Sequence, residues 1–342
     1  MVREQYDSEL SMPISKLLIS FFILFVQFAT LPLSYATTTA DTIPNNIFMY
    51  HRFDDERYPS TNTTLNQLQE HLEYLTESGF KFIYLKDLIA SPQDSKTISI
   101  TIDDAYQSFY QTGLPVFEKY NVPVTLFLNT SSVGGSENLT WQELRDLLNR
   151  GVDIQNHTHS HPHLPDLDES GIRQEIELSQ KLMQENLNIT PNLFAYPYGE
   201  ASAAAKNIVS EYFDAAFGQH SGAFSMNDPY FIARFPFNEN YGDLNRIKDA
   251  SIVLPFEDIS ISPSDPLMTT PTDRFVVDST NGVEGINCYI SDFQGSIDKT
   301  IATIENKMLI QLERSPVQGR LRFNCTQVKK GIYWYGFQYY LP

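Results

Sequence analysis

The chain has 342 residues, of which 42 are acidic and 24 are basic, so its formal net charge is −18. So acidic a surface repels nucleic acid and anionic lipid, and the composition argues against both as partners. It suits a neutral or cationic polymer, although an acidic surface often serves solubility alone.

The first 36 residues have the pattern of a secretory leader whose true start is Met12. Lys16 precedes the apolar stretch 17–33, and Ser34-Tyr35-Ala36 forms a small-x-small cleavage site. The alternative is an uncleaved membrane anchor, but polar residues interrupt the apolar stretch, which favours cleavage. We therefore expect export to the periplasm or the extracellular space, with no stable membrane span once the leader is removed.

Strand-like apolar runs alternate with amphipathic helical segments between residues 46 and 212. The expected strands are 46–53, 97–102, 123–128, 152–155 and 193–196, and the expected helices are 65–78, 108–120, 140–149, 169–187 and 201–212. The S/T-x-x-E spacing of Thr140 and Glu143 marks one helix start. Repeated strand and helix units predict an α/β domain over residues 41–250, with parallel strands in a sheet or barrel and functional groups on the loops after the strands.

The pattern changes near residue 250, after a short helical stretch at 243–250. The strands expected beyond it are 252–256, 275–278, 285–290, 308–312, 319–324 and 331–340. Short strands with turn signals between them predict a small antiparallel β-sandwich over residues 251–342. Cys288 and Cys325 lie in this part, and an oxidising compartment favours a disulfide between them over two buried thiols.

Two adjacent carboxylates, Asp103 and Asp104, directly follow the expected strand 97–102. Neighbouring side chains of a strand diverge, and like charges repel, so the two are expected to have different roles. One can bind a cation while the other stays free as a base. The alternative is a simple Asp-Asp turn.

Four of the seven histidines form an alternating row just after the expected strand 152–155: His157, His159, His161 and His163. Imidazole is a common ligand of zinc and other divalent metals, and a catalytic site needs three protein ligands with an open position for water. A lone histidine is more often a packed or surface residue. A row of them beside an acidic strand end predicts a metal site.

Three motifs follow one another in the chain: Thr101-Ile102-Asp103-Asp104-Ala105, then His157-Thr158-His159-Ser160-His161 with Pro162 after it, then Ala195-Tyr196-Pro197-Tyr198-Gly199. They resemble the T-F-D-D-G, H-[ST]-x-x-H and R-x-P-Y motifs of the polysaccharide deacetylases of the NodB-homology type, also called carbohydrate esterase family 4. The resemblance covers residues 46–250. An ordered set of three motifs is far more specific than any one of them.

The resemblance implies a distorted (β/α) barrel in which Asp104, His157 and His161 bind a divalent metal. Zinc is the expected metal, with cobalt, nickel or iron as alternatives. By the same resemblance Asp103 is the general base, and the backbone N–H of Tyr198 donates to the oxyanion. His159 and His163 then either have no role in the site or contact the metal ligands without binding the metal.

The chain departs from the family pattern in two places. Ala195 replaces the arginine that opens the third motif, so the arginine that usually holds the catalytic carboxylate is missing. Arg234 either supplies a guanidinium from another strand or forms a surface ion pair. No histidine follows His220, so the late histidine that commonly serves as general acid is absent. His51, at the end of the first strand, is the candidate general acid, and His220 is a weaker candidate. The alternative for each is an ordinary hydrogen-bonded histidine without a catalytic role.

Residues expected to contact a sugar are Tyr106, Trp141, Pro197 and Arg234, because aromatic rings stack on pyranose faces and these positions lie near the expected loops. The alternative for Trp141 is helix packing. The aromatic segment 333–340 offers either a glycan-binding face or packing against the first domain.

The sequence therefore predicts an exported, metal-dependent hydrolase that removes N-acetyl groups from an amino-sugar polysaccharide, such as poly-N-acetylglucosamine or a chitin-like polymer, and releases acetate. The loss of the arginine and the Tyr50-His51-Arg52-Phe53 segment are similar to the branch with exported poly-β-1,6-N-acetylglucosamine deacetylases. One alternative is an O-deacetylase of a glycan such as xylan. Another is a non-catalytic glycan-binding protein, against which the retained carboxylates and histidines argue.

Overall fold

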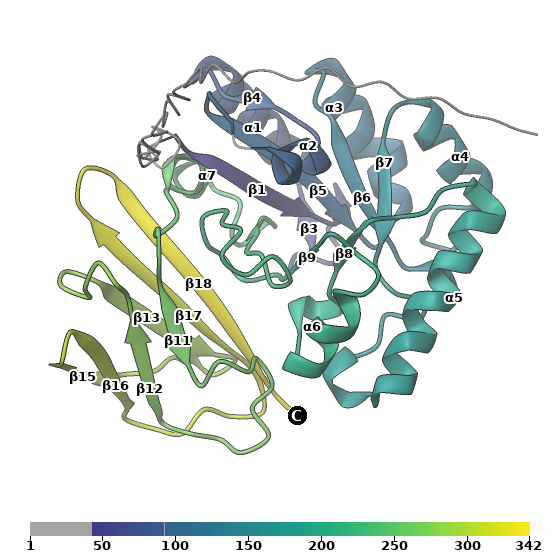
Figure 1. Cartoon of the computed structure of the whole chain (residues 1–342). Coiled ribbons are helices and arrows are strands. Elements are labelled where there is room, and N and C mark those ends of the chain that lie inside the picture. The colour runs from purple at the N-terminus through teal and green to yellow at the C-terminus, as the bar shows by residue number, and fades with distance from the viewer. Residues whose placement is uncertain (1–42, 92) are drawn as a thin grey trace, which may run out of the picture. The chain divides into compact units, whose positions relative to one another are not determined.

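A parallel sheet forms the centre of the first domain in the computed structural model, which describes residues 43–91 and 93–342 (Figure 1). The expected leader lies outside these residues. The strand order is β10-β1-β5-β6-β7-β8-β9, and β4 also pairs with β5. The strands are β1 (Asn45–Tyr50), β4 (Lys81–Phe82), β5 (Thr97–Asp103), β6 (Val124–Leu128), β7 (Asp153–Asn156), β8 (Leu193–Ala195), β9 (Ala215–Phe217) and β10 (Phe235–Pro236). Each of these pairings is parallel, as the alternating pattern predicted.

The segment 232–236 connects the two edges of this curved sheet. The N–H of Ile232 donates to the Ala216 carbonyl over 2.9 Å, and the carbonyl of Ile232 accepts from Gly218 N–H over 2.9 Å, so the segment continues beyond β9. Three residues later Phe235 pairs with Phe48 of β1. Arg234 lies between these two contacts, and its buried side chain reaches Asp103 at the end of β5.

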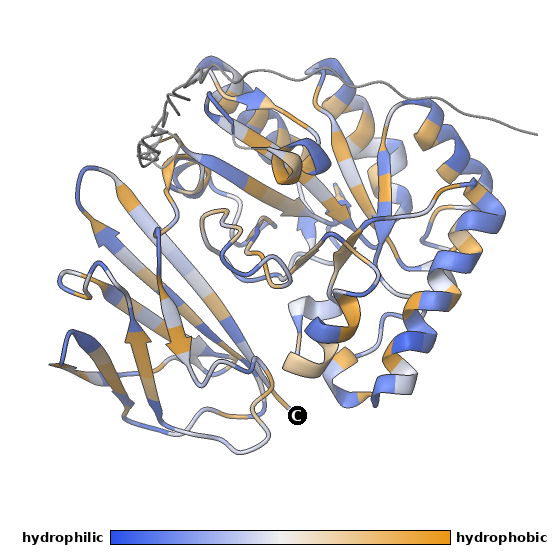
Figure 2. Cartoon of the chain, viewed as in Figure 1, coloured by the Kyte–Doolittle hydropathy of each residue, from blue (hydrophilic) through white to orange (hydrophobic). Residues whose placement is uncertain are grey.

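Helices cover the outer side of the sheet (Figure 1). They are α1 (Leu65–Glu77), α2 (Leu85–Ala90), α3 (Leu114–Lys119), α4 (Trp141–Asn149), α5 (Glu169–Leu187), α6 (Ala203–Val209) and α7 (Leu244–Ile252). The capping box at Thr140 is confirmed: its hydroxyl accepts from Glu143 N–H, and the Glu143 carboxylate accepts from Thr140 N–H. Hydrophilic and hydrophobic residues alternate along α5, as an amphipathic helix requires (Figure 2).

Several expected boundaries are wrong. The helix expected at 108–120 is formed with bounds within one residue, but its first part, Phe109–Gly113, is a π-helix that continues into α3. The strand expected at 252–256 is not formed, because α7 continues to Ile252 and only Leu254 makes an isolated bridge, to Tyr333. The short pair β2 (Arg52–Phe53) and β3 (Asn62–Thr63), which forms a separate sheet, replaces the end of the first expected strand.

The C-terminal part consists of two four-stranded antiparallel sheets, as the sandwich prediction requires. Their orders are β11-β12-β16-β15 and β14-β13-β17-β18. The strands are β11 (Ser260–Ser262), β12 (Arg274–Asp278), β13 (Asn287–Asp292), β14 (Gly295–Ser296), β15 (Lys299–Ile304), β16 (Lys307–Leu312), β17 (Gly319–Val328) and β18 (Ile332–Leu341). Phe275 of one sheet packs on Phe323 and Tyr339 of the other, with ring centroids 4.7 and 5.4 Å apart. Along β12 and β16, buried residues therefore alternate with more exposed ones.

Strand β18 also contacts loops that belong to the first domain. The carbonyl of Trp334 accepts from Ala223 N–H over 3.0 Å, and Trp334 N–H donates to the Leu254 carbonyl over 3.0 Å. The indole packs edge-on against Phe235 of β10, with centroids 5.3 Å apart. Part of the aromatic segment 333–340 therefore packs against the first domain. Within the described ranges no helix combines the length and the apolar character needed to cross a membrane.

Cys288 and Cys325 form a disulfide between β13 and β17, where they pair directly across the two strands. The bond closes a loop with a sequence separation of 37. In the chain-entropy view, such a loop stabilises the folded state by about 3–4 kcal/mol.

We predict that replacing both cysteines by alanine lowers the free energy of unfolding of the C-terminal sheets by about 3 kcal/mol. Urea unfolding followed by tyrosine and tryptophan fluorescence measures the change. Metal binding at the first domain serves as the control, because the cysteines do not take part in the candidate site. An unchanged urea midpoint would contradict the prediction.

Candidate active site

The candidate site lies where the parallel strands end. Asp103 is the last residue of β5, and His157 directly follows β7. Tyr198 follows β8 after two residues, and His51 directly follows β1. The carboxyl ends of parallel strands meet at one edge of the sheet, which is the usual place for an active site in this class of fold.

Asp104, His157 and His161 form a cluster that can hold a metal ion, because their ligand atoms all lie within 4.8 Å of one another. The Oδ1 atom of Asp104 is 3.6 Å from Nε2 of His157 and 3.4 Å from Nε2 of His161. Asp104 and His161 both adopt the left-handed backbone conformation, with φ of 74° and 58°. Such strained residues occur at sites where the surroundings fix the backbone for function.

The donor set fits a divalent cation. Nδ1 of the fully buried His157 donates to the Ala195 carbonyl over 2.7 Å, so Nε2 is the ring nitrogen that faces the cluster. That Nε2 atom is buried and has no hydrogen-bond partner among the described residues. Burial and the neighbouring His157 lower the pKa of His161 to about 4, so its ring is neutral at pH 7. Two imidazoles and one carboxylate are an ordinary ligand set for zinc and related metals.

Two asparagines hold Asp104 in place. Nδ2 of Asn129 donates to Oδ1 of Asp104 over 3.1 Å, and Nδ2 of Asn138 donates to its backbone carbonyl over 3.0 Å. The sequence motifs indicate neither residue. Asn129 could have been found, because it directly follows β6 and so lies at the same edge of the sheet.

Glu175 of α5 organises the histidine row. One of its carboxylate oxygens accepts from the N–H groups of His159 and Ser160, over 3.0 and 2.7 Å. The Thr158 hydroxyl accepts from His161 N–H over 3.1 Å, which closes the turn between the two ligating histidines. His159 itself bonds to Thr130 through Nδ1 and is not a member of the cluster.

Arg234 pairs with Asp103 inside the protein. Its Nη1 and Nη2 atoms donate to the two carboxylate oxygens over 2.8 Å each, and both side chains are fully buried. The same guanidinium donates to the Thr101 hydroxyl and to the Gly218 carbonyl. Burial by itself raises the pKa of Asp103, but the Arg234 guanidinium together with the nearby His157 and His51 outweighs burial and lowers the pKa to about 2.

This pairing corrects two expectations for Arg234. A surface ion pair is wrong, because the side chain is 0% exposed. A direct substrate contact does not fit either, because the guanidinium faces Asp103, Thr101 and Gly218. Arg234 therefore supplies from the segment 232–236 the guanidinium that Ala195 cannot supply.

Both candidate general acids are located by the structure. His51 is half-buried; burial lowers its pKa, although the nearby Asp103 and Asp104 act in the opposite direction. His220 is 2% exposed, its ring packs on Phe231 with centroids 4.6 Å apart, and burial lowers its pKa to about 3. His51 thus lies within the field of the two site carboxylates, and His220 is buried in an apolar contact.

The expected sugar contacts have different environments. The Arg52 guanidinium lies 3.4 Å from the centroid of the Tyr106 ring, and burial together with Asp104 raises the pKa of Tyr106 to about 12. Trp141 is half-buried and packs against the core of the parallel sheet. Pro197 is a buried residue of the loop after β8. A sugar contact by any of these residues stays a prediction.

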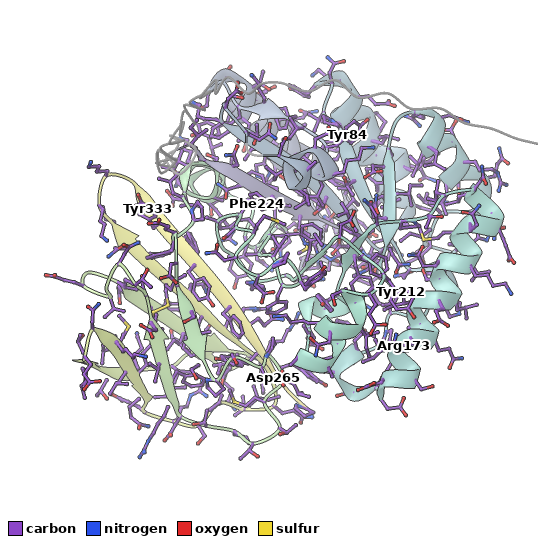
Figure 3. The ribbon with its side chains drawn as sticks, viewed as in Figure 1. Tyr84, Arg173, Tyr212, Phe224, Asp265 and Tyr333 are labelled. Carbon is purple, nitrogen blue, oxygen red and sulfur yellow. A yellow bond between two sulfur atoms is a disulfide. The ribbon has the colours of Figure 1, made fainter. Side chains whose placement is uncertain are left out.

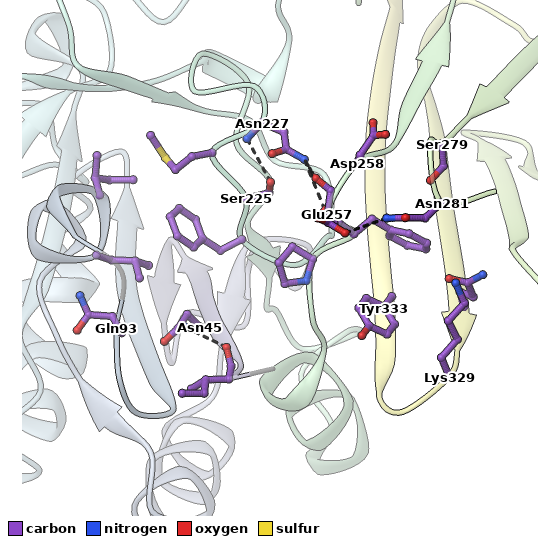
Figure 4. Close-up of a pocket in the computed structure, with 18 of the residues that line it drawn as sticks. Asn45, Gln93, Ser225, Asn227, Glu257, Asp258, Ser279, Asn281, Lys329 and Tyr333 are labelled. Carbon is purple, nitrogen blue, oxygen red and sulfur yellow. Dashed lines mark hydrogen bonds between the residues drawn. The ribbon is translucent and has the colours of Figure 1, made fainter. Parts of the chain in front are cut away.

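Two cavities lie away from the metal cluster. One of about 680 Å³ is lined by Asn45 and Gln93 of the first domain and by Glu257, Lys329 and Tyr333 (Figure 4). The other, about 430 Å³, includes His220 in its lining. Neither lining contains a residue of the cluster, so the chemistry of the side chains, and not cavity size, identifies the candidate site.

Comparison with known proteins gives a consistent result. Residues 90–212 match the polysaccharide deacetylase family. The chain contains a polysaccharide deacetylase domain of the NodB type. A poly-beta-1,6-N-acetyl-D-glucosamine N-deacetylase of Staphylococcus aureus is 24% identical over 190 residues, which are 50% of this chain and 65% of that protein.

Two further matches show how far the similarity reaches. The protein YxkH of Bacillus subtilis (strain 168) is 27% identical over 158 residues, 45% of this chain and 56% of its own length. The Streptococcus pyogenes deacetylase PplD, solved in complex with acetate, has a TM-score of 0.56 at 20% identity, over 61% of this chain and 99% of that chain. The chain thus spans about three fifths of the length of the curated relatives it matches, and the solved structure shows that the fold is shared.

We predict that Arg234→Met lowers the free energy of unfolding at pH 7 by about 3–5 kcal/mol, because it leaves a buried carboxylate without its cation. In the native protein the low pKa of Asp103 means that the pair stabilises above about pH 4 and that this contribution is lost between about pH 4 and pH 2. In the variant Asp103 takes up a proton more readily, so the difference from the native chain shrinks on acidification.

The matched control is Arg173→Met, which removes an ion pair with Glu211 whose two side chains are 35% and 52% exposed (Figure 3). An exposed pair contributes less than about 1 kcal/mol. Urea unfolding at pH 7 and pH 4 measures both variants. Equal losses for the two arginines would contradict the role given to Arg234.

We also predict that His157→Ala weakens zinc binding more than about 100-fold, whereas His159→Ala leaves it within a few-fold of the native value. The two histidines belong to the same row, but only the first has a buried ring nitrogen in the cluster. Competition with a chromogenic chelator measures both affinities. Zinc binding lost equally in both variants would place the ligands elsewhere.

Proposed function

We propose that this protein hydrolyses the N-acetyl groups of an amino-sugar polysaccharide of the poly-β-1,6-N-acetylglucosamine type, in a metal-dependent reaction that releases acetate. One observation carries the proposal. A ligand cluster of one carboxylate and two imidazoles lies beside a second carboxylate, Asp103, which is held by Arg234 and is not part of the cluster.

Asp104, His157 and His161 would hold the cation. Bound there, a divalent metal lowers the pKa of a water molecule and polarises the acetamide carbonyl. The hydrogen bonds from Asn129 to Asp104 and from His157 to the Ala195 carbonyl orient the ligands in advance.

Asp103 would accept the proton of the attacking water. Its low pKa keeps the carboxylate ionised at every physiological pH, so the basic form is always present. The two bonds from Arg234 fix its direction, which is the role of a tether. The water oxygen then bonds to the acetyl carbon, and the charge that develops on the carbonyl oxygen is stabilised by the N–H of Tyr198.

The last step breaks the bond between the acetyl carbon and the nitrogen, and the nitrogen takes a proton to become a free amine. His51 would pass this proton, because it follows β1 at the same sheet edge and lies in the field of both carboxylates. The products are acetate and a sugar with a free amino group. The acidic chain, with a net charge of −18, suits a polymer that becomes cationic as it loses acetyl groups.

Three observations support the choice of substrate and compartment. The Staphylococcus aureus relative is named for its action on poly-beta-1,6-N-acetyl-D-glucosamine. The disulfide between Cys288 and Cys325 favours an oxidising compartment. The expected secretory leader also favours export, and we propose that the protein acts outside the cytoplasm.

We predict that the purified protein releases acetate from β-1,6-linked N-acetylglucosamine oligomers, that a chelator abolishes the release, and that Asp103→Asn lowers kcat about 10²–10⁴-fold. Mass spectrometry of the oligomers, with a loss of one acetyl group per cleavage, measures the reaction. The matched control is Asp278→Asn, which removes a half-exposed partner of Lys307 in the C-terminal sheets.

O-acetylated xylan oligomers tested in parallel separate the amidase from an esterase, because the same chemistry attacks both bonds. Faster release from the O-acetylated substrate would replace the proposed reaction with O-deacetylation. Binding of the polymer with no acetate release by the metal-loaded protein would make it a glycan-binding protein.

A further inference from the structure

We infer that the C-terminal sheets complete the active site: Arg320 of β17 and Gln338 of β18 are positioning residues that fix the backbone of Tyr198, the expected oxyanion donor. The inference rests on the proposed function and adds to it the role of a domain that the family match does not cover. Residues 90–212 match the family, and both positioning residues lie far beyond this range.

The loop that carries Tyr198 has a conformation that needs support. Tyr198 has φ of 58° and ψ of 4°, in the left-handed region that costs a non-glycine residue about 1–2 kcal/mol. The next residue, Gly199, also has a positive φ, and a Cβ there would lie 2.3 Å from the Gln219 backbone nitrogen. The loop is therefore held in one shape by its neighbours and not by its own preference.

The support comes from the C-terminal sheets. The Tyr198 carbonyl accepts from Nη1 of Arg320 over 3.2 Å and from Nε2 of Gln338 over 3.3 Å. The same Nε2 atom donates to the Gly199 carbonyl over 3.0 Å. The N–H and the carbonyl of Tyr198 flank one Cα atom, so contacts that hold the carbonyl also limit the directions in which the N–H can point.

Gln338 is built for this contact. Its side chain is 1% exposed, and its Oε1 atom accepts from Nε of Arg322 over 3.2 Å. This bond fixes which end of the amide faces the loop, so that the donor end meets the Tyr198 and Gly199 carbonyls. A buried amide with both ends engaged is rigid, as a positioning group must be.

A row of rings connects β18 to the metal cluster at the same loop. Tyr340 stacks on His163 with centroids 5.6 Å apart, and His163 stacks on Tyr198 at 4.2 Å. The Tyr198 ring in turn meets the ligand His161 edge-on at 4.5 Å. The Tyr340 hydroxyl donates to Asp166 over 3.0 Å, which fixes the outer end of the row. Backbone and side chain of Tyr198 are thus both held from β17 and β18.

The test replaces Gln338 by methionine, which has a similar length and no donor. We expect kcat for β-1,6-linked N-acetylglucosamine oligomers to fall at least tenfold with KM changed less than threefold, because an oxyanion donor acts mainly in the transition state. Zinc affinity should stay within a few-fold. Backbone amides of residues 196–200 should exchange hydrogen for deuterium faster than in the native chain.

The matched control is Gln327→Met in the same sheet. Gln327 is 5% exposed and donates from Nε2 to the Glu284 carbonyl within the C-terminal part. Gln327→Met loses one buried bond to a backbone carbonyl, whereas Gln338→Met loses two, so its thermal stability should fall by no more than that of Gln338→Met while kcat and exchange at 196–200 stay native. Arg320→Met, at a side chain that is 36% exposed, should lower kcat several-fold, and Arg320→Lys should restore part of the loss.

The outcomes separate the two proposals. A native chain that releases no acetate contradicts the proposed function, whereas faster exchange at 196–200 in Gln338→Met alone still supports the positioning contact. An active native chain whose kcat and exchange are unchanged in both Gln338→Met and Arg320→Met overturns the inference. Equal losses of kcat in Gln338→Met and Gln327→Met also overturn it, because they would reflect stability alone.

Discussion

A buried carboxylate remains ionised only when a cation faces it, and the Asp103–Arg234 pair meets this condition at the centre of the first domain. The pair fixes more than a protonation state. Arg234 reaches Asp103 because the segment 232–236 runs from β9 to β1, beside which its end forms the edge strand β10. The stretch of chain that pairs with both β9 and β1 therefore also supplies the cation for Asp103.

The pair also separates the roles of two adjacent carboxylates. Asp103, the last residue of β5, points to Arg234, whereas Asp104 leaves the strand with a positive φ and points to the two histidines. One carboxylate is thus charge-balanced by an internal guanidinium, and the other is left to a cation from outside. The unpartnered Nε2 of His157 completes the ligand set. This division of roles is what metal-assisted hydrolysis with a separate base requires.

The C-terminal sheets extend the same principle to the third motif. A strained loop keeps its shape only where its surroundings determine it, and at Tyr198 the surroundings include Arg320 and Gln338. The solved deacetylase PplD is matched over 99% of its own length but over only 61% of this chain, so a large part of this chain has no counterpart there. The C-terminal sheets contact the loop of the third motif directly, through Arg320 and Gln338.

Local sequence determined much of this protein. Apolar periodicity and capping predicted β1, β5, β6, β7 and β8 and most of the helices between them, but not β4, α2, β9 or β10. Helix α5 has the predicted bounds because a long amphipathic helix is marked by its own residues. The resemblance of three short motifs to a known family predicted the three residues that the structure brings together in a cluster able to hold a metal. The alternation of the late strands predicted two facing antiparallel sheets for the same reason.

Only the tertiary structure decided the contacts between residues far apart in the chain. Arg234 and Asp103 are separated by 131 positions, and Gln338 and Tyr198 by 140, so neither pair leaves a local pattern. Two-residue strands such as β10 are too short for periodicity to mark them, and they form because neighbouring strands offer hydrogen bonds. The sequence by itself determined the chemistry that is available; packing decided which cation meets which carboxylate, because charge pairing depends on distance in space and not along the chain.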